Sequence, residues 1–165
     1  MAQFADHIRQ VERNLKFLES INSTTKDCYD WQVTVCFYTS LHLVNAHLSK
    51  HNMQFRTHND VNFALNFTRE LSPAKMPEDE YIAYTSLQTL SRRSRYLVNE
   101  KDSQIGSPQA FFTYEKHVAK AIRHLDCLLS YFKKLYSIEL SNINISCMEI
   151  KRKEDLKQIT LTSSH

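Results

Sequence analysis

Residues 30–47 read DWQVTVCFYTSLHLVNAH, and this stretch decides the fold class. Its apolar residues spread over a broad part of a helix surface, which is typical of a helix that other helices surround. They include Trp31, Val35, Phe37, Leu41 and Val44, and Leu48 follows directly after the stretch. We therefore expect a central helix over residues 26–51, with hydroxyl groups in the preceding stretch 22–25 to cap its start.

Amphipathic patterns on either side of this stretch predict four more helices, over 3–21, 58–71, 77–99 and from Pro108 onward. The first and last patterns are the most regular, because their apolar residues recur at steps close to three or four. In the first they are Phe4, Ile8, Val11, Leu15 and Leu18, and in the last Phe111, Val118, Ile122, Leu125, Leu129 and Phe132. Within 58–71 the residues sharing a face are Phe63, Phe67 and Leu71. The predicted fold class is all-α, a bundle of about five helices.

The composition agrees with a helical protein. Only one of the 165 residues is glycine and three are proline, too few for the tight turns of a multi-stranded sheet. The net charge of +3 is too weak to identify a nucleic-acid binder by itself. The four cysteines have no CxxC spacing, which predicts free thiols in a reducing compartment. No apolar run is long enough to span a bilayer, so we expect a cytoplasmic protein without a membrane partner.

After Ser137 the spacing of apolar residues becomes an alternating one, which is typical of short strands. The alternating residues are Ile143, Ile145 and Cys147, followed by Ile159 and Leu161. We therefore divide the chain into a helical bundle over 1–137 and a C-terminal β-hairpin or extended tail over 138–165. Because an isolated hairpin is only marginally stable, this segment is expected to pack on the bundle or on a partner.

A column of hydrogen-bonding side chains follows the expected central helix. Its members are three or four residues apart and so share one side of the helix: Asp30, Thr34, Tyr38, His42 and Asn45. Polar groups beside an apolar surface need hydrogen-bond partners or a ligand. One interpretation is an internal network in which these groups bond to their neighbours. The other is a polar cleft whose lining includes Asp30, Tyr38, His42 and Asn45.

Three arginines and a tyrosine gather near the end of the fourth expected helix, in the sequence SRRSRY at 91–96. Guanidinium groups within one turn repel one another unless phosphate, carboxylate or water lies between them. Compensation of the helix dipole is the ordinary role of a basic helix end. The other interpretation is a binding site for an anion or a single-stranded nucleic acid, formed by Arg92, Arg93, Arg95 and Tyr96.

These segments resemble bacterial HEPN-like proteins, the higher eukaryotes and prokaryotes nucleotide-binding domain family. The likeness lies in the pattern Asp-Trp-x5-Phe-Tyr-x2-Leu-His from Asp30 to His42, in His58, and in LSRRSRY at 90–96. It covers about residues 27–99. The resemblance implies an up-and-down helical bundle that often dimerises. Members of the family cut RNA, bind nucleotides, or act as partners of nucleotidyltransferases in defence and toxin systems.

The chain departs from the ribonuclease members of that family at their catalytic motif. Those members carry an arginine followed by four to six residues and then a histidine, a spacing that no arginine of this chain has. Acid–base cleavage requires proximity in space and not in sequence, so a composite site stays open. Its candidate catalytic residues are His42 or His58, together with Arg93 or Arg95.

Metal and cofactor sites are not expected. Among eight histidines only His47 and His51 have helical ligand spacing, and neither a carboxylate nor a cysteine stands at a companion position. A chain with one glycine also cannot build the glycine-rich phosphate loops of kinases or dinucleotide enzymes.

Three functions from different classes stay open. The first is a dimeric module that binds RNA or a nucleotide, in a bacterial defence or toxin–antitoxin type system. The second is a metal-independent ribonuclease with a non-standard Arg/His site. The third is a structural subunit whose helices present an apolar seam to a second protein.

Overall fold

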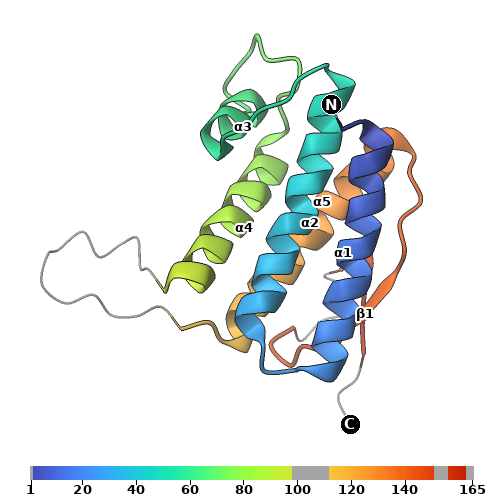
Figure 1. Cartoon of the computed structure of the whole chain (residues 1–165), viewed down its shortest axis with the longest axis vertical. Helices are drawn as coiled ribbons and strands as arrows, with labels where there is room; N and C mark the ends of the chain where they lie inside the picture. The colour runs from blue at the N-terminus through green and yellow to red at the C-terminus, as the bar shows by residue number, and fades with distance from the viewer. Residues whose placement is uncertain (1, 98–111, 151–155, 163–165) are drawn as a thin grey trace, which may run out of the picture.

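The computed structural model of the chain describes residues 2–97, 112–150 and 156–162. Within them the chain forms five helices and two short strands (Figure 1). The helices are α1 (Phe4–Thr24), α2 (Tyr29–Lys50), α3 (His58–Leu65), α4 (Glu78–Tyr96) and α5 (Glu115–Tyr136), and the strands are β1 (Ile143–Ile145) and β2 (Ile159–Leu161). The prediction of an all-α bundle of about five helices is confirmed. None of the described helices combines the length and apolarity that a membrane crossing needs.

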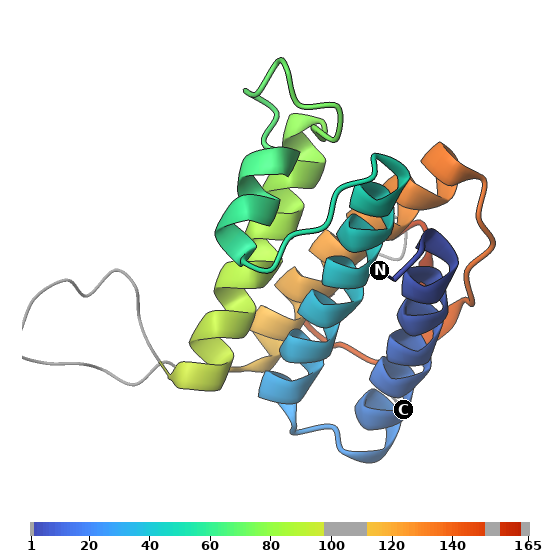
Figure 2. The same cartoon turned by 45° about the horizontal axis from the view of Figure 1, so that its top comes forward.

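Helix α2 lies at the centre of the bundle, as its broad apolar surface predicted. It packs against α1, α4 and α5, and α1, α2, α4 and α5 alternate in direction (Figures 1 and 2). Val35, Phe37, Val44 and Leu48 are buried in the shared core. Trp31 was expected on the apolar surface, yet 60% of it is exposed, since it lies in the first turn of α2 at one end of the bundle.

The apolar faces of α1 and α5 pack inward as predicted. Their buried residues include Val11, Leu15 and Leu18 of α1 and Val118, Ile122, Leu125, Leu129 and Phe132 of α5. Helix α5 begins later than expected, because Tyr114 is its N-cap and the Tyr114 N–H donates to Nδ1 of His117 at 2.9 Å. Residues 112–114 are therefore not helical, and the predicted start over 108–111 lies outside the described residues.

Helix α3 is shorter than predicted and ends at Leu65 instead of Leu71. Asn66 adopts an extended conformation, and its Oδ1 accepts a hydrogen bond from the Thr68 N–H at 2.9 Å, which starts a turn. Leu71 is 98% exposed and Phe63 is also exposed, so the expected shared face of Phe63, Phe67 and Leu71 was wrong. Helix α4 ends where Leu97 takes a left-handed φ of 52°, and the predicted end at residue 99 lies outside the described part.

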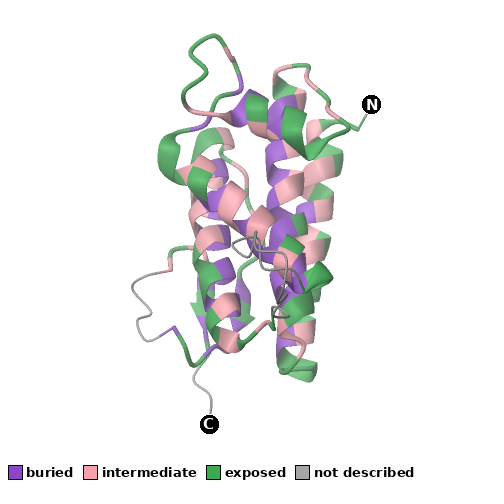
Figure 3. Cartoon of the chain, turned by 90° about the vertical axis from the view of Figure 1, so that its left-hand side faces the viewer, coloured by how far each residue is buried: buried purple, intermediate pink, exposed green. Residues whose placement is uncertain are grey.

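The two C-terminal strands lie where the alternating pattern placed them, but they pair in parallel. Ile143 is opposite Ile159, and Ile145 is opposite Leu161, with all four side chains buried. The strands of a hairpin are antiparallel, so β1 and β2 do not form the expected hairpin. Strand β1 packs against α1. Figure 3 shows the buried residues gathered on the inner faces of the helices and the exposed residues on the outer ones.

Side chains of α1 and α5 hold this C-terminal segment in place. Glu19 accepts the Asn144 N–H at 2.8 Å, and Asn22 accepts the Ser146 N–H at 2.8 Å. The buried carboxylate of Asp126 on α5 accepts three successive backbone N–H groups, those of Lys157, Gln158 and Ile159, at 2.7, 2.7 and 2.9 Å. These bonds anchor β1 to α1 and β2 to α5, and the alternation of apolar residues could not specify them.

Candidate functional site

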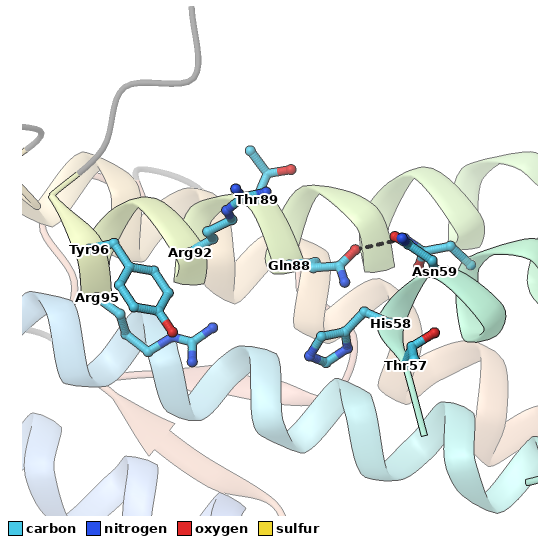
Figure 4. Close-up of a pocket in the computed structure, with 9 residues that line it drawn as sticks. Thr57, His58, Asn59, Gln88, Thr89, Arg92, Arg95 and Tyr96 are labelled. Carbon is cyan, nitrogen blue, oxygen red and sulfur yellow. Dashed lines mark hydrogen bonds between the residues drawn. The ribbon is translucent and has the colours of Figure 1, made fainter. Parts of the chain in front are cut away.

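A polar pocket lies between the start of α3 and the second half of α4. Its volume of about 540 Å³ is within the roughly 300–1,000 Å³ range of small-ligand sites. The lining residues that matter below are His58 and Asn62 of α3 and Gln88, Arg92, Arg95 and Tyr96 of α4 (Figure 4). The pocket therefore brings two of the three predicted arginines, Arg92 and Arg95, together with one of the predicted histidines.

Helical spacing puts three of these side chains on one face of α4. Gln88, Arg92 and Arg95 follow one another at steps of four and three residues, so they point the same way. Arg93 is about 100° further round the helix and faces α5 instead. Burial lowers the pKa of His117 on α5 most, and the positive charge of Lys116 lowers it further. The charge of Arg93 is the next contribution in the same direction. Arg93, predicted as part of one anion site with its neighbours, is thus directed away from the pocket.

The start of α3 positions His58 at the pocket. Thr57 caps the helix, since its hydroxyl oxygen accepts the Asp60 N–H at 3.2 Å. The His58 ring packs on Phe37 of α2 with 5.6 Å between ring centroids. Burial of part of the ring, and then the charge of Arg95, lower the pKa of His58. His58 is therefore neutral at pH 7 and can accept a proton beside a guanidinium group.

Tyr38 connects the polar column of α2 with the arginines of α4. An Arg95 guanidinium N–H donates a long hydrogen bond of 3.5 Å to the Tyr38 hydroxyl. The Arg95 guanidinium carbon lies 5.8 Å from the Tyr38 ring centroid and 5.3 Å from that of Tyr96, whose ring is 63% exposed. Two aromatic faces and a cation thus lie together at an exposed surface beside the pocket.

The rest of the predicted column lies elsewhere. Asp30 is exposed, Thr34 is buried and Asn45 is partly buried, and none of them lines the pocket. His42 meets α1, where its Nδ1 lies 3.2 Å from Nδ1 of His7. Residues spaced three or four apart are not aligned along the helix axis, because a turn takes 3.6 residues. The column therefore shifts around α2, so that Tyr38 meets α4 and His42 meets α1. The cleft lining expected from Asp30, Tyr38, His42 and Asn45 is consequently split between two surfaces.

His47, whose spacing to His51 was considered for metal binding, is a buried structural residue. Its Nε2 donates to the Ala74 carbonyl at 3.0 Å, so Nδ1 accepts from the Tyr136 hydroxyl at 2.6 Å. Both ring nitrogens are therefore occupied by protein groups. Among the residues described here, no three His, Cys, Asp or Glu side chains are grouped as metal ligands would be.

The stability of the protein is expected to fall below about pH 6.5. Burial lowers the pKa of His47, and burial likewise lowers those of His7 and His42. Each ring is then neutral in the folded state while the unfolded chain takes up a proton, so stability is full above the ordinary histidine pKa and declines as pH falls below it. Melting temperatures between pH 7.5 and 5 measure this loss. His47→Gln, which removes one titrating ring, should show a smaller loss than the wild type, and an equal loss would contradict the assignment.

The four cysteines are free thiols, as predicted. Burial raises the pKa of Cys36 to about 12, so this thiol stays protonated at neutral pH. A protonated, buried thiol is a poor nucleophile, so Cys36 is not a candidate for nucleophilic chemistry.

Sequence reasoning missed the amide side of the pocket. Asn62 of α3 donates from Nδ2 to Oε1 of Gln88 at 2.9 Å, and this bond ties α3 to α4. Asn and Gln are common on exposed helix faces, so the residue type alone does not indicate a binding site. The position of Gln88, four residues before Arg92, was the available clue that it shares the arginine face.

Comparisons of this chain with family models, with curated proteins and with solved structures gave no match. The geometry and chemistry of the pocket are therefore the basis on which a function can be proposed.

Proposed function

We propose that the chain binds RNA or a nucleotide through the pocket between α3 and α4. The observation that carries the proposal is the meeting of Arg92, Arg95 and Tyr96 of α4 with His58 of α3 in one pocket. Guanidinium groups bind phosphate with fork-shaped donors, and an exposed aromatic face can stack an unpaired base. A single-stranded or free nucleotide offers both groups, whereas a duplex hides its base faces.

The sequence resemblance to HEPN-like proteins supports the same proposal. The segments that carry it supply Tyr38, His58, Arg92 and Arg95, and these residues lie near one another in and beside the pocket. A homodimer and a role in a bacterial defence or toxin–antitoxin type system are part of this proposal through that resemblance.

The affinity for single-stranded RNA is expected to depend on salt with a modest slope. Each phosphate contact on a single strand contributes about −0.7 to the slope of log K against log salt, so two arginines predict about −1.4. Titrations of a fluorescent RNA at several salt concentrations measure it. Undetectable binding at low salt would remove the proposal and leave a structural interaction subunit.

Metal-independent RNA cleavage is a second candidate, favoured by the closeness of His58 and Arg95. His58 would take the proton of a ribose 2′-hydroxyl as that oxygen attacks phosphorus, and Arg95 would stabilise the charge on the phosphoryl oxygens. The bond from phosphorus to the 5′ oxygen would break and water would give that oxygen a proton, which yields a 2′,3′-cyclic phosphate and a 5′-hydroxyl end.

If cleavage occurs, His58→Ala is expected to reduce its rate about 10²–10⁴-fold, the usual contribution of an acid–base group. The assay uses purified protein, single-stranded RNA and a chelator. His42→Ala is the matched control, because His42 bonds to His7 and does not line the pocket. RNA left intact by the wild type, or equal activity of both variants, would exclude this second candidate.

A further inference from the structure

Trp31 is an exposed aromatic residue outside the pocket. It is the only tryptophan of the chain, and 60% of it is exposed in the first turn of α2. Tryptophan is highly buried on average, and it is enriched where proteins contact their ligands and partners. Trp31 is therefore a candidate contact for a bound molecule.

Trp31 and Tyr38 lie on the same side of α2. Seven residues turn a helix by about 20° less than two full turns, and they advance it by about 10 Å. Long side chains on a helix lean toward its N-terminal end, so Tyr38, which is 40% exposed, leans toward Trp31. Two exposed aromatic side chains thus follow one another along one side of the helix.

The arginine end of the pocket adjoins this side of α2. Helices α2 and α4 run in opposite directions, so the end of α4 lies beside the first half of α2 (Figure 1). There Arg95 donates to the Tyr38 hydroxyl at 3.5 Å, and its guanidinium carbon lies 5.8 Å from the Tyr38 ring centroid. Helix α4 ends at Tyr96, so it does not extend along the first turns of α2. The exposed aromatic side of α2 therefore continues from Arg95 and Tyr38 to Trp31.

Cations next to exposed aromatic rings match the chemistry of a single strand. Proteins bind such strands with positive groups along the phosphates and with aromatic side chains on which the bases stack. Successive nucleotides of a stacked strand are about 3.4 Å apart, so the roughly 10 Å from Tyr38 to Trp31 corresponds to about three steps. A mononucleotide held at the arginines is too short to reach Trp31, whereas a strand of several nucleotides is long enough.

We propose that Tyr38 and Trp31 form a base-stacking track that continues from the pocket, and that the ligand is single-stranded RNA and not a free nucleotide. Phosphates of the strand bind at Arg92 and Arg95, and its bases stack on Tyr38 and then on Trp31. This inference rests on the proposed binding function and specifies its ligand.

Tryptophan fluorescence of the full chain tests the reach of the ligand. Because Trp31 is the only tryptophan, the emission reports on this side chain alone. Octauridylate should quench the emission when its bases stack on the ring. Uridine 5′-monophosphate, at a concentration that occupies the arginines, should leave the emission unchanged. Equal quenching by the two ligands would overturn the requirement for a strand.

Substitution of Trp31 tests the contribution of stacking to affinity. Trp31→Ala should weaken the binding of fluorescein-labelled octauridylate on the order of tenfold, the usual effect of one lost base contact, and should leave the affinity for uridine 5′-monophosphate unchanged. Trp31→Phe keeps an aromatic face and should retain most of the affinity for the octamer. Fluorescence anisotropy measures the binding of the octamer, and calorimetry that of the monophosphate.

Phe63→Ala is the matched control. Phe63 is 57% exposed on α3, and the Arg69 guanidinium carbon lies 3.9 Å from its ring centroid. It is thus another exposed aromatic residue with an arginine beside it, and it lines neither the pocket nor the track. Its loss should leave the affinity for octauridylate unchanged.

Octauridylate that binds the wild type and Trp31→Ala equally overturns the track and leaves Trp31 to a protein partner, while the binding function survives. If neither octauridylate nor the monophosphate binds the wild type at low salt, the track and the binding function are overturned together.

Discussion

Asp126→Ala is expected to lower the free energy of unfolding by about 3–5 kcal/mol, the range seen when one partner of a buried charged network is removed. The carboxylate is buried and accepts the N–H groups of Lys157, Gln158 and Ile159. Alanine leaves these three donors without an acceptor and frees β2 from α5. Chemical unfolding followed by far-ultraviolet circular dichroism measures the change.

Asp27→Ala is the control for this variant, because it removes an exposed carboxylate and should change stability by less than about 0.5 kcal/mol. Limited proteolysis should also cut the C-terminal segment of Asp126→Ala faster than that of the wild type. Identical unfolding midpoints for Asp126→Ala and the wild type would contradict the anchoring role of this carboxylate.

The double variant Arg92→Gln/Arg95→Gln is expected to weaken RNA or nucleotide binding on the order of 100-fold. A hydrogen bond to a charged group contributes about 1.5–3 kcal/mol, and two such losses amount to at least about 3 kcal/mol. The slope of log K against log salt should fall toward zero at the same time. Fluorescence anisotropy with single-stranded RNA measures both quantities.

Two single variants distinguish the position of a charge from the overall charge of the protein. Arg93→Gln removes a neighbouring guanidinium that faces α5, and Arg13→Gln removes an exposed one on α1. Each changes the net charge by one unit, yet neither residue lines the pocket. Equal losses in these controls and in the pocket variants would show that the affinity comes from the overall charge and not from the pocket.

Much of the bundle could be predicted from the sequence because helix formation and burial depend on local spacing. The pattern in 30–47 identified the central helix, and the regular apolar residues identified the buried faces of α1 and α5. Among the helix boundaries, the errors lie at the start of α5 and at the end of α3. The start of α5 depends on a hydrogen bond between the Tyr114 N–H and His117, and the end of α3 depends on a turn at Asn66. Each is a single local contact, and the spacing of apolar residues does not predict it.

The candidate site could be predicted only in part, for a related reason. Sequence proximity grouped Arg93 with Arg92 and Arg95, although one residue step turns a helix by 100° and sends Arg93 toward α5. His42 and Tyr38 were grouped by their four-residue spacing, but different neighbouring helices meet them, α1 at His42 and α4 at Tyr38. The pairing of Asn62 with Gln88 and the anchoring of β2 by Asp126 join distant residues, and no local pattern signals either.

The most direct test of the proposed binding site is to map where RNA contacts the molecule. At 19.4 kDa the chain suits backbone amide nuclear magnetic resonance, and a short single-stranded RNA can be titrated into the isotope-labelled protein. Binding at the pocket predicts the largest shift changes at residues 57–62 and 88–96, with Tyr38 among the affected neighbours. Shift changes confined to the α1 and β1 side of the bundle, with residues 57–62 and 88–96 unaffected, would contradict it.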